Sequence, residues 1–219
     1  MTPLTLIIGN KNYSSWSLRP WLVLRQASIP FEEVRILLYR PESAAALAAW
    51  SPSGKVPALH DGDTGVWDSL AICEYLHERF PEQGLWPVDA AARAVARSVS
   101  AEMHAGFDAL RQSMSMNIRG HYPDKGRTPE CLADIERILA IWADCRARYG
   151  HGGDFLFGRF SIADAMYAPV VLRFQTYGVA LEGAARDYAD AILWLPALQA
   201  WVADAQAEAE RIEKFDLYE

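Results

Sequence analysis

The chain changes its residue pattern once, near residue 80, and this change constrains the fold more than any other feature. Before it, short apolar runs typical of strands alternate with stretches of helical periodicity. Strands are expected at residues 4–8, 32–38, 56–59 and 65–67, and helices at 16–27, 42–50 and 69–80. Residues 81–90 contain two prolines and a glycine and predict a linker. Every periodic stretch after the linker indicates a helix.

These patterns predict an α/β unit over residues 1–80 and an all-helical unit over residues 91–219. The first two strands are joined by a helix and should be parallel, whereas the turn "DGDTG" should make the last two antiparallel. Helices are expected at 91–118, at 129–149, from Ser161 with Asp164 in capping-box spacing, and after Pro196. Two units of different architecture favour a ligand site at their junction.

Composition excludes several classes of function. Of 219 residues, 51 % are hydrophobic, which suffices for a core, and the net charge of −7 argues against a nucleic-acid partner. An odd count of three cysteines without a C-x-x-C spacing argues against disulfides and against a metal site. The first residues do not resemble a signal peptide, and no apolar run approaches the roughly 20 residues of a membrane span. We expect a cytoplasmic protein with no membrane partner.

The stretch "GKVPAL", residues 54–59, places a proline at the start of a predicted strand. Pro57 forfeits one hydrogen bond of the sheet, since it has no N–H. A cis Val56–Pro57 bond would turn the backbone N–H and C=O of Val56 outward, where an extended peptide can pair with them. A trans proline at a sheet edge is the alternative reading of the same residues.

Polar residues begin two of the predicted helices. Asp68 and Ser69 precede the helix at 69–80, and Ser14 and Ser15 precede the helix at 16–27. The free N–H groups of a first helical turn, together with a hydroxyl, bind carboxylates and other anions. Asp68 also offers a carboxylate to an ammonium group. Taken alone, each pair is better explained by ordinary helix capping, because Asp and Ser are favoured at helix starts in any protein.

The order of these three stretches resembles that of the glutathione transferase family, and the resemblance extends over nearly the whole chain. Hydroxyls follow the first strand, Val–Pro precedes the third, an acidic–Ser pair opens the third helix, and "SIAD" opens a later one. The resemblance implies a thioredoxin-like N-terminal domain over 1–80 and an all-α C-terminal domain over 91–219. It also implies glutathione as co-substrate, a cis Pro57 and a two-fold homodimer.

The resemblance further implies a role for each polar residue. Asp68 would hold the ammonium of glutathione, Ser69 the γ-glutamyl carboxylate, Val56 the cysteinyl backbone, and Lys55 the glycine carboxylate. The run "SSWS" is most similar to the serine-type classes, particularly the zeta class, in which a cysteine stands at the position of Trp16. Ser14 would then stabilise the thiolate, with Ser15 beside it and Tyr13 as a competing donor.

The electrophile pocket is expected in the helical domain, from His104, Phe107, Arg111 and Met114 at helical spacing, with Trp16 at its edge. His104 is alternatively a core histidine, and Arg111 a solvated side chain. The favoured function is conjugation of glutathione to a small electrophile. A zeta-type isomerase and a non-catalytic glutathione carrier are the alternatives. Reduction through a mixed disulfide is disfavoured, because no cysteine precedes Cys73.

Overall fold

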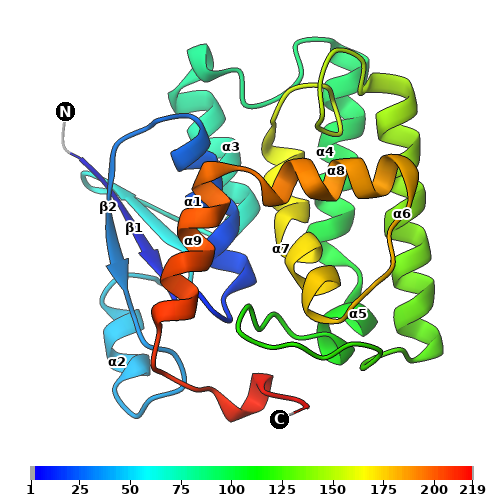
Figure 1. Cartoon of the computed structure of the whole chain (residues 1–219). Helices are drawn as coiled ribbons and strands as arrows, with labels where there is room; N and C mark the ends of the chain where they lie inside the picture. The colour runs from blue at the N-terminus through cyan, green and yellow to red at the C-terminus, as the bar shows by residue number, and fades with distance from the viewer. Residues whose placement is uncertain (1–2, 219) are drawn as a thin grey trace.

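The computed structural model describes residues 3–218, and its first part is a four-stranded mixed sheet with helices packed on it (Figure 1). The strands are β1 (Leu4–Ile8), β2 (Phe31–Arg35), β3 (Ala58–Asp61) and β4 (Thr64–Trp67), in the order β2-β1-β3-β4. The helices are α1 (Ser15–Gln26), α2 (Ser43–Ala48) and α3 (Ser69–Arg79). The predicted parallel β1–β2 pair and antiparallel β3–β4 hairpin are confirmed. The third strand begins at Ala58 rather than residue 56, after Pro57, which has no N–H for a ladder.

The second part is helical. After a 3₁₀ turn at Pro81–Gln83 it contains α4 (Ala90–Ala105), α5 (Asp108–Ser113), α6 (Pro129–Tyr149), α7 (Ile162–Thr176), α8 (Gly183–Leu193) and α9 (Pro196–Ala207), and a 3₁₀ turn at Glu213–Phe215 follows. The helix predicted at 129–149 and the one after Pro196 are confirmed. No helix within residues 3–218 combines the length and the apolar character needed to cross a lipid bilayer.

The prediction of one continuous helix over 91–118 is wrong. The chain leaves the helix at Gly106, and Phe107 has a left-handed backbone with φ of 62°. Glycine disfavours a helix interior, and the Arg111 side chain donates to the carbonyls of Met103, His104 and Gly106, which end α4. These side-chain bonds from the next helix replace the hydrogen bonds that a continuing helix would make, so α4 ends at Ala105.

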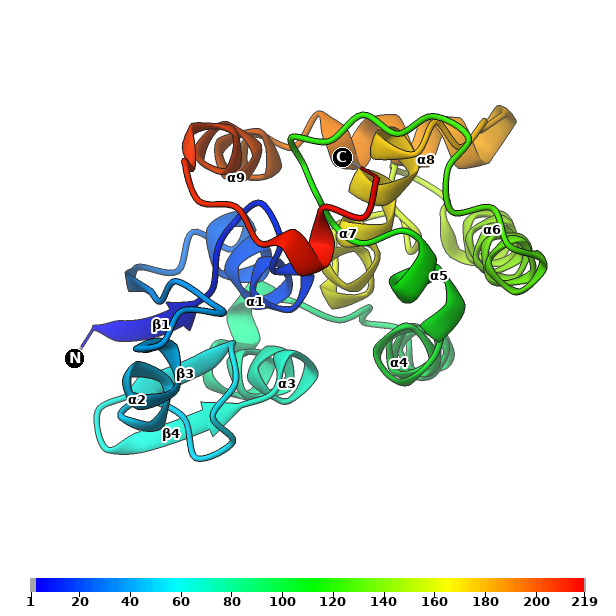
Figure 2. The same ribbon diagram turned by 90° about the horizontal axis from the view of Figure 1, so that it is seen from below.

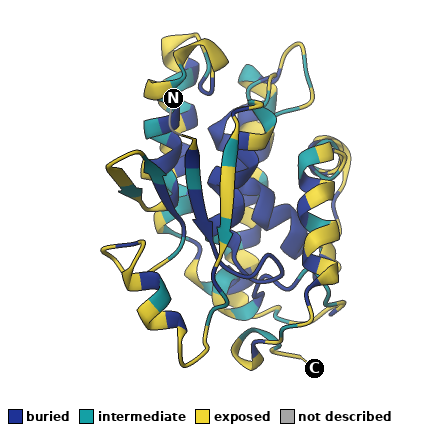
Figure 3. Ribbon diagram, turned by 90° about the vertical axis from the view of Figure 1, so that its left-hand side faces the viewer, coloured by how far each residue is buried: buried dark blue, intermediate teal, exposed yellow. Residues whose placement is uncertain are grey.

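The core is continuous from the sheet to the helical part. Helix α1 lies between the sheet and α7, as Figure 2 shows from below. Almost every residue of α7 is buried, and the central helices and strands are the most buried parts of the molecule (Figure 3). The predicted capping box of α7 is present: Ser161 and Asp164 bond reciprocally at its start. The first residue of α1, Ser15, accepts a hydrogen bond from Arg173 of α7, so the N-terminus of α1 is held against the helical part.

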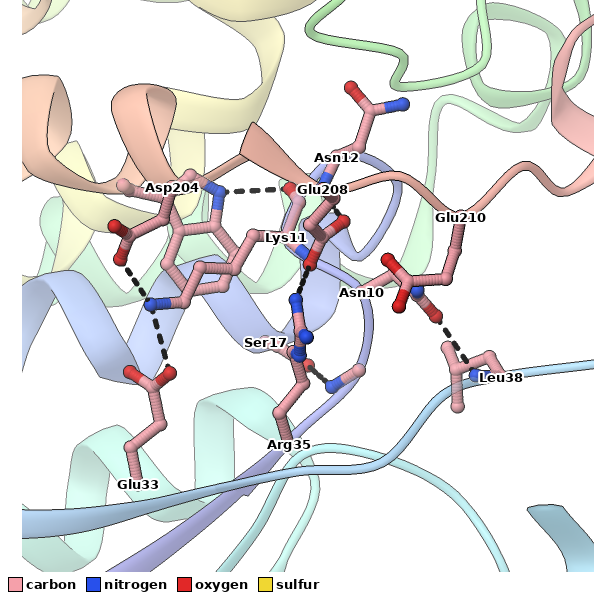
Figure 4. A network of polar contacts seen from close by, with 12 residues as sticks. Asn10, Lys11, Asn12, Ser17, Glu33, Arg35, Leu38, Asp204, Glu208 and Glu210 are labelled. Carbon is pink, nitrogen blue, oxygen red and sulfur yellow. Dashed lines mark hydrogen bonds and ion pairs between the residues drawn. The ribbon is translucent and has the colours of Figure 1, made fainter. Parts of the chain in front are cut away.

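Residues 208–218, here called the C-terminal strap, return from α9 across the lower end of α1 (Figures 1 and 2). The buried Glu208 carboxylate accepts the N–H groups of Lys11 and Asn12 and pairs with Arg35 (Figure 4). The Lys11 ammonium is buried near the rings of Trp21 and Trp201 and pairs with Glu33 and Asp204. The loop from β1 to α1 is therefore fastened on both sides.

Candidate active site

Two adjoining cavities lie beside the N-termini of α1 and α3. The first, of about 470 Å³, is lined by Trp16, Ser53, Lys55, Val56, Pro57, Trp67, Asp68, Ser69 and His104. The second, of about 590 Å³, is lined by Tyr13, Ser14, Trp16, Leu38, Tyr39, Arg40, Ser43, Ala44, Leu47, Gly54, Lys55, Val56 and Phe215. Trp16, Lys55 and Val56 line both cavities, so the two form one continuous candidate site.

The first cavity gathers the polar groups predicted around α3. Asp68 caps this helix, because its Oδ1 accepts the N–H groups of Leu70 and Ala71 at 2.9 and 3.2 Å. Its backbone has a positive φ of 79°, which a non-glycine residue rarely adopts. Ser69 is buried at the first helical position, and the Val56–Pro57 bond is cis as predicted. An anion in this cavity meets the N-terminal end of a helix.

His104 reaches the first cavity from α4, where its Nε2 lies 3.1 Å from Asp68 Oδ2. Burial lowers the pKa of His104, and the positive charges of Arg19 and Arg111 lower it further, against the opposing effect of the Asp68 carboxylate. The imidazole is accordingly favoured in its neutral form, in which Nε2–H can donate to Asp68. This contact joins the helical part of the chain to the α3 turn.

The two predicted serines have different partners. Ser14 caps α1, accepting the Ser17 N–H at 3.3 Å, and its hydroxyl donates to Ser17 Oγ at 2.7 Å. Ser17 Oγ in turn accepts the Gly9 N–H. Ser15 Oγ instead accepts a hydrogen bond of 3.3 Å from Arg173 Nη2, which comes from α7. Ser14 lines the second cavity, whereas Ser15 lies behind it as the first residue of α1.

The Tyr13 hydroxyl points into the C-terminal strap. It donates to Asp216 Oδ1 at 2.8 Å and accepts from Arg119 and from the Ile212 N–H. Tyr13 lines the second cavity, and the centroid of its ring lies 6.0 Å from that of the Phe215 ring. The hydroxyl of Tyr13 therefore forms its hydrogen bonds with the strap and with Arg119.

Trp16 lines both cavities, and two cations contact its ring. The guanidinium carbons of Arg19 and Arg111 are 4.3 and 4.7 Å from the centroid of its ring, and the His104 ring meets it edge-on at 5.2 Å. Burial lowers the pKa of the Arg19 guanidinium and lowers that of Arg173 to about 9. The positive charges of neighbouring arginines lower both pKa values further. Within residues 3–218, no carboxylate forms an ion pair with Arg19, Arg111 or Arg173.

The helical part supplies less of the cavity walls than predicted. Phe107 and Met114 are buried in the core and line neither cavity. Arg111 folds back onto the end of α4, lines neither cavity and contacts the ring of Trp16. The walls of the second cavity come instead from Leu38, Tyr39, Arg40, Leu47 and Phe215, which sequence reasoning missed. These residues belong to loops, to a short helix and to the strap, where no periodicity reveals a facing side.

The described residues hold no group of three or more histidine, cysteine or acidic side chains placed to bind a metal ion. The three cysteines are unpaired and buried, and burial raises the pKa of each thiol. Raised thiol pKa values disfavour the thiolate, which is the reactive form.

Comparison with known families identifies both parts of the chain. Residues 13–79 match the glutathione S-transferase N-terminal domain, and residues 89–204 match the C-terminal domain. The chain belongs to the glutathione S-transferase family. Family membership identifies the protein as a glutathione transferase. It also confirms the predicted fold, with a thioredoxin-like N-terminal part and a helical C-terminal part.

The relatives that this chain is similar to carry different names. A probable maleylacetoacetate isomerase of Caenorhabditis elegans is 33% identical over 70% of this chain and 73% of its own length. The zeta-class glutathione S-transferase of Euphorbia esula is 28% identical over 72% of this chain and 71% of its own. Among solved structures, a glutathione transferase homolog from Burkholderia with bound glutathione has a TM-score of 0.71 at 21% identity, covering 94% of this chain and 100% of its own.

Proposed function

We propose that this glutathione transferase transfers the glutathione thiolate to a small electrophile in the joined cavities. The observation that carries the proposal is the convergence of three predicted stretches on one site. Asp68 and Ser69, Val56 and Pro57, and the turn that begins at Ser14 all line cavities that meet at Trp16. These stretches are far apart in sequence but lie together around the joined cavities. Their hydroxyl, carboxylate and ammonium groups match a peptide that carries two carboxylates and an ammonium.

The first cavity would hold the γ-glutamyl end of glutathione. Ser69 and the first turn of α3 offer donors for its carboxylate, and Asp68 offers a carboxylate for its ammonium. The backbone of Val56 would pair with the cysteinyl unit, as an added strand does. Lys55 is exposed and lines both cavities, where its ammonium can attract the glycine carboxylate.

The chemical step requires the sulfur as a thiolate. A free thiol has a pKa of about 8.5, so lowering it by two units takes about 2.7 kcal/mol. One charge-assisted hydrogen bond contributes about 1.5–3 kcal/mol, and a helix N-terminus about 0.3–1 kcal/mol. A serine hydroxyl at the start of α1 therefore suffices by donating to the sulfur: the thiol proton passes to water, and the serine need not act as a base. Ser14 is the serine that lines the cavity.

Two relatives favour an alternative activity, since they are named for maleylacetoacetate isomerisation. The indole of Trp16 occupies the position of the zeta-class cysteine, and it fills space between the cavities. We therefore place isomerisation second and a non-catalytic glutathione carrier third.

Steady-state assays with glutathione test the proposal. We expect saturable turnover of a chloronitrobenzene electrophile, and glutathione binding by calorimetry with a stoichiometry of one per chain. Binding without turnover of several electrophiles would indicate the carrier. Isomerisation of maleylacetoacetate without conjugation would indicate the zeta-type activity.

We also propose a two-fold homodimer in the cytoplasm, as the family resemblance implies, with neither nucleic acid nor membrane as a partner. Sedimentation velocity tests the dimer: a single species with the mass of one chain would contradict it.

A further inference from the structure

The second cavity combines aromatic walls with positive charge. Its lining includes Tyr13, Trp16, Tyr39 and Phe215, and also Arg40 and Lys55. Among the described residues that line it, none is acidic. The chain as a whole carries a net charge of −7, so the charge of this cavity is opposite to that of the molecule. A cavity lined by positive charge attracts anions and raises their local concentration.

The C-terminal strap brings a third cation to the same cavity. Lys214 Nζ lies 5.4 Å from the centroid of the Tyr39 ring and 5.8 Å from that of the Phe215 ring, and both rings line the cavity. Within residues 3–218, no carboxylate forms an ion pair with Arg40, Lys55 or Lys214. The charges of these three side chains are therefore available to a bound anion.

The rings of Tyr39 and Phe215 suit a planar ligand. Tyr39 is 59% exposed and has a left-handed backbone with φ of 60°, and its ring meets that of Phe215 edge-on at 5.5 Å between centroids. A large aromatic side chain held exposed by a sparsely populated backbone conformation points to a role in binding rather than in the core. An aromatic ligand would gain apolar contact and favourable ring contacts with both side chains.

Glutathione itself accounts for only part of this positive charge. In the proposed binding mode its glycine carboxylate pairs with Lys55, and its other carboxylate lies at the start of α3 in the first cavity. Arg40 and Lys214 then remain without an anion, next to the aromatic walls. Ser14, the proposed donor to the sulfur, lines the same cavity as Arg40. One small molecule in this cavity can therefore meet both the sulfur and a cation.

We infer that the electrophile of this transferase is a planar aromatic acid, whose ring packs against Tyr39 and Phe215 and whose carboxylate pairs with Arg40 and Lys214. The inference rests on the proposed function, because it names the substrate of the same thiolate. With a halogenated ring, the sulfur forms a bond to the ring carbon that carries the halogen. The carbon–halogen bond breaks and the halide leaves with the electron pair. The thiol proton passes to water, and the carboxylate is unchanged.

A matched pair of electrophiles tests the inference on the wild-type protein. A fluoronitrobenzoate and the corresponding fluoronitrobenzamide have nearly the same shape, but only the first carries a negative charge. Each kcat/KM is divided by the rate constant of the uncatalysed reaction of the same compound with glutathione, which removes the difference in intrinsic reactivity. On this scale we expect the acid to exceed the amide by about tenfold, the effect of one charge-assisted hydrogen bond. Equal values would overturn the inference.

Substitutions at the two cations locate the preference in the cavity. Arg40→Gln and Lys214→Gln should each reduce the preference for the acid, and the double variant should abolish it. The loss should appear mainly as a raised KM for the acid, since its carboxylate keeps the same charge in the bound state and in the transition state. Arg159→Gln is the matched control, because Arg159 is an exposed arginine of the loop before α7 that lines neither cavity. It makes the same change in net charge and should leave the preference unaltered.

The outcomes separate this inference from the proposed function. Turnover of neither compound would contradict the proposed function and, with it, the inference. Turnover of both compounds without a preference would keep the function and overturn the aromatic acid as substrate. A preference that survives the double variant would also overturn the inference, since the carboxylate would then be recognised elsewhere. So would an equal loss of preference in Arg159→Gln, because overall charge rather than the cavity would then attract the acid.

Discussion

Ser14 has both a structural and a proposed chemical role. Its oxygen caps α1 by accepting the Ser17 N–H, and its side chain lines the second cavity. Removing an N-cap hydroxyl typically lowers stability by about 1 kcal/mol. The two roles can be separated because capping changes the free energy of unfolding, whereas donation to sulfur changes the pKa of the thiol.

Ser14→Ala should raise the pKa of bound glutathione by about one unit and lower the free energy of unfolding by about 1 kcal/mol. Thiolate absorbance against pH and urea denaturation measure the two effects. Thr128→Ala is the matched control, because Thr128 caps α6 through the same kind of bond to the Cys131 N–H at 3.2 Å. It should reduce stability only. An equal thiol pKa in Ser14→Ala and wild type would remove Ser14 from the mechanism.

The contact between His104 and Asp68 predicts a pH effect with a definite sign. The folded-state pKa of His104 lies below its usual value, so the fold favours the neutral imidazole. Its contribution to stability is present above pH of about 6.5 and is lost as pH falls through the lowered pKa. The Asp68 carboxylate opposes this lowering.

Asp68→Asn should therefore lower the pKa of His104 further, since the variant lacks the carboxylate that favours the imidazolium. Titration of the imidazole resonances by NMR measures this value. Glu130→Gln, which removes an exposed carboxylate from the first turn of α6, should leave the His104 titration unchanged. A rise of the His104 pKa in Asp68→Asn would mean that the pair is not coupled as the geometry indicates.

At the scale of elements, α7 depends on one buried carboxylate. Asp164 accepts the N–H groups of Leu156 and Ser161 and the Ser161 hydroxyl, at 2.8–3.0 Å. Since α7 packs on α1, α4 and α8, the start of α7 positions much of the helical part. Burial raises the pKa of Asp164 to about 6 in spite of these donors.

Asp164→Ala should lower the free energy of unfolding by about 3 kcal/mol, because it leaves three donors without their acceptor. The raised pKa also gives the loss a pH dependence. A carboxyl group whose pKa is higher in the folded than in the unfolded state stabilises the fold most when it is protonated. For Asp164 this stabilisation is full below the unfolded pKa of about 3.9 and declines as pH rises through the folded pKa of about 6. Urea denaturation across that window should show a larger effect of the substitution at low pH. A constant difference would contradict the raised pKa.

Elements with local signals were predicted from the sequence, and elements fixed by distant contacts were not. Thr128 and Pro129 mark the start of α6, and Ser161 and Asp164 that of α7, because capping uses residues within one turn. The end of α4 depends on Arg111 bonding back across the turn, which periodicity does not reveal. In the site, Asp68, Ser69 and Ser14 were predicted at helix starts. Phe215 was missed because only the path of the strap brings it to the cavity.

At the scale of the whole molecule, the C-terminal strap links the sheet, the loop after α5 and the candidate site. Asp216, whose side chain is 4% exposed, receives hydrogen bonds from Tyr13, Asn117 and Arg211. The adjacent Phe215 lines the second cavity. We therefore expect the Asp216 carboxylate to hold Phe215 in the cavity wall, so that local opening of the strap would expose the cavity.

Asp216→Ala should open the strap more often, because the Tyr13 hydroxyl and the Asn117 amide lose their acceptor when the strap is closed. A loss of about 2 kcal/mol corresponds to about thirtyfold faster tryptic cleavage after Arg211 and Lys214, if opening is fast relative to cleavage. Mass spectrometry of timed digests under native conditions measures these rates. Glu213→Ala is the matched control, since Glu213 is an exposed carboxylate of the same strap. Equal rates in the two variants would mean that Phe215 is held by its ring contacts with Tyr13 and Tyr39 rather than by the Asp216 carboxylate.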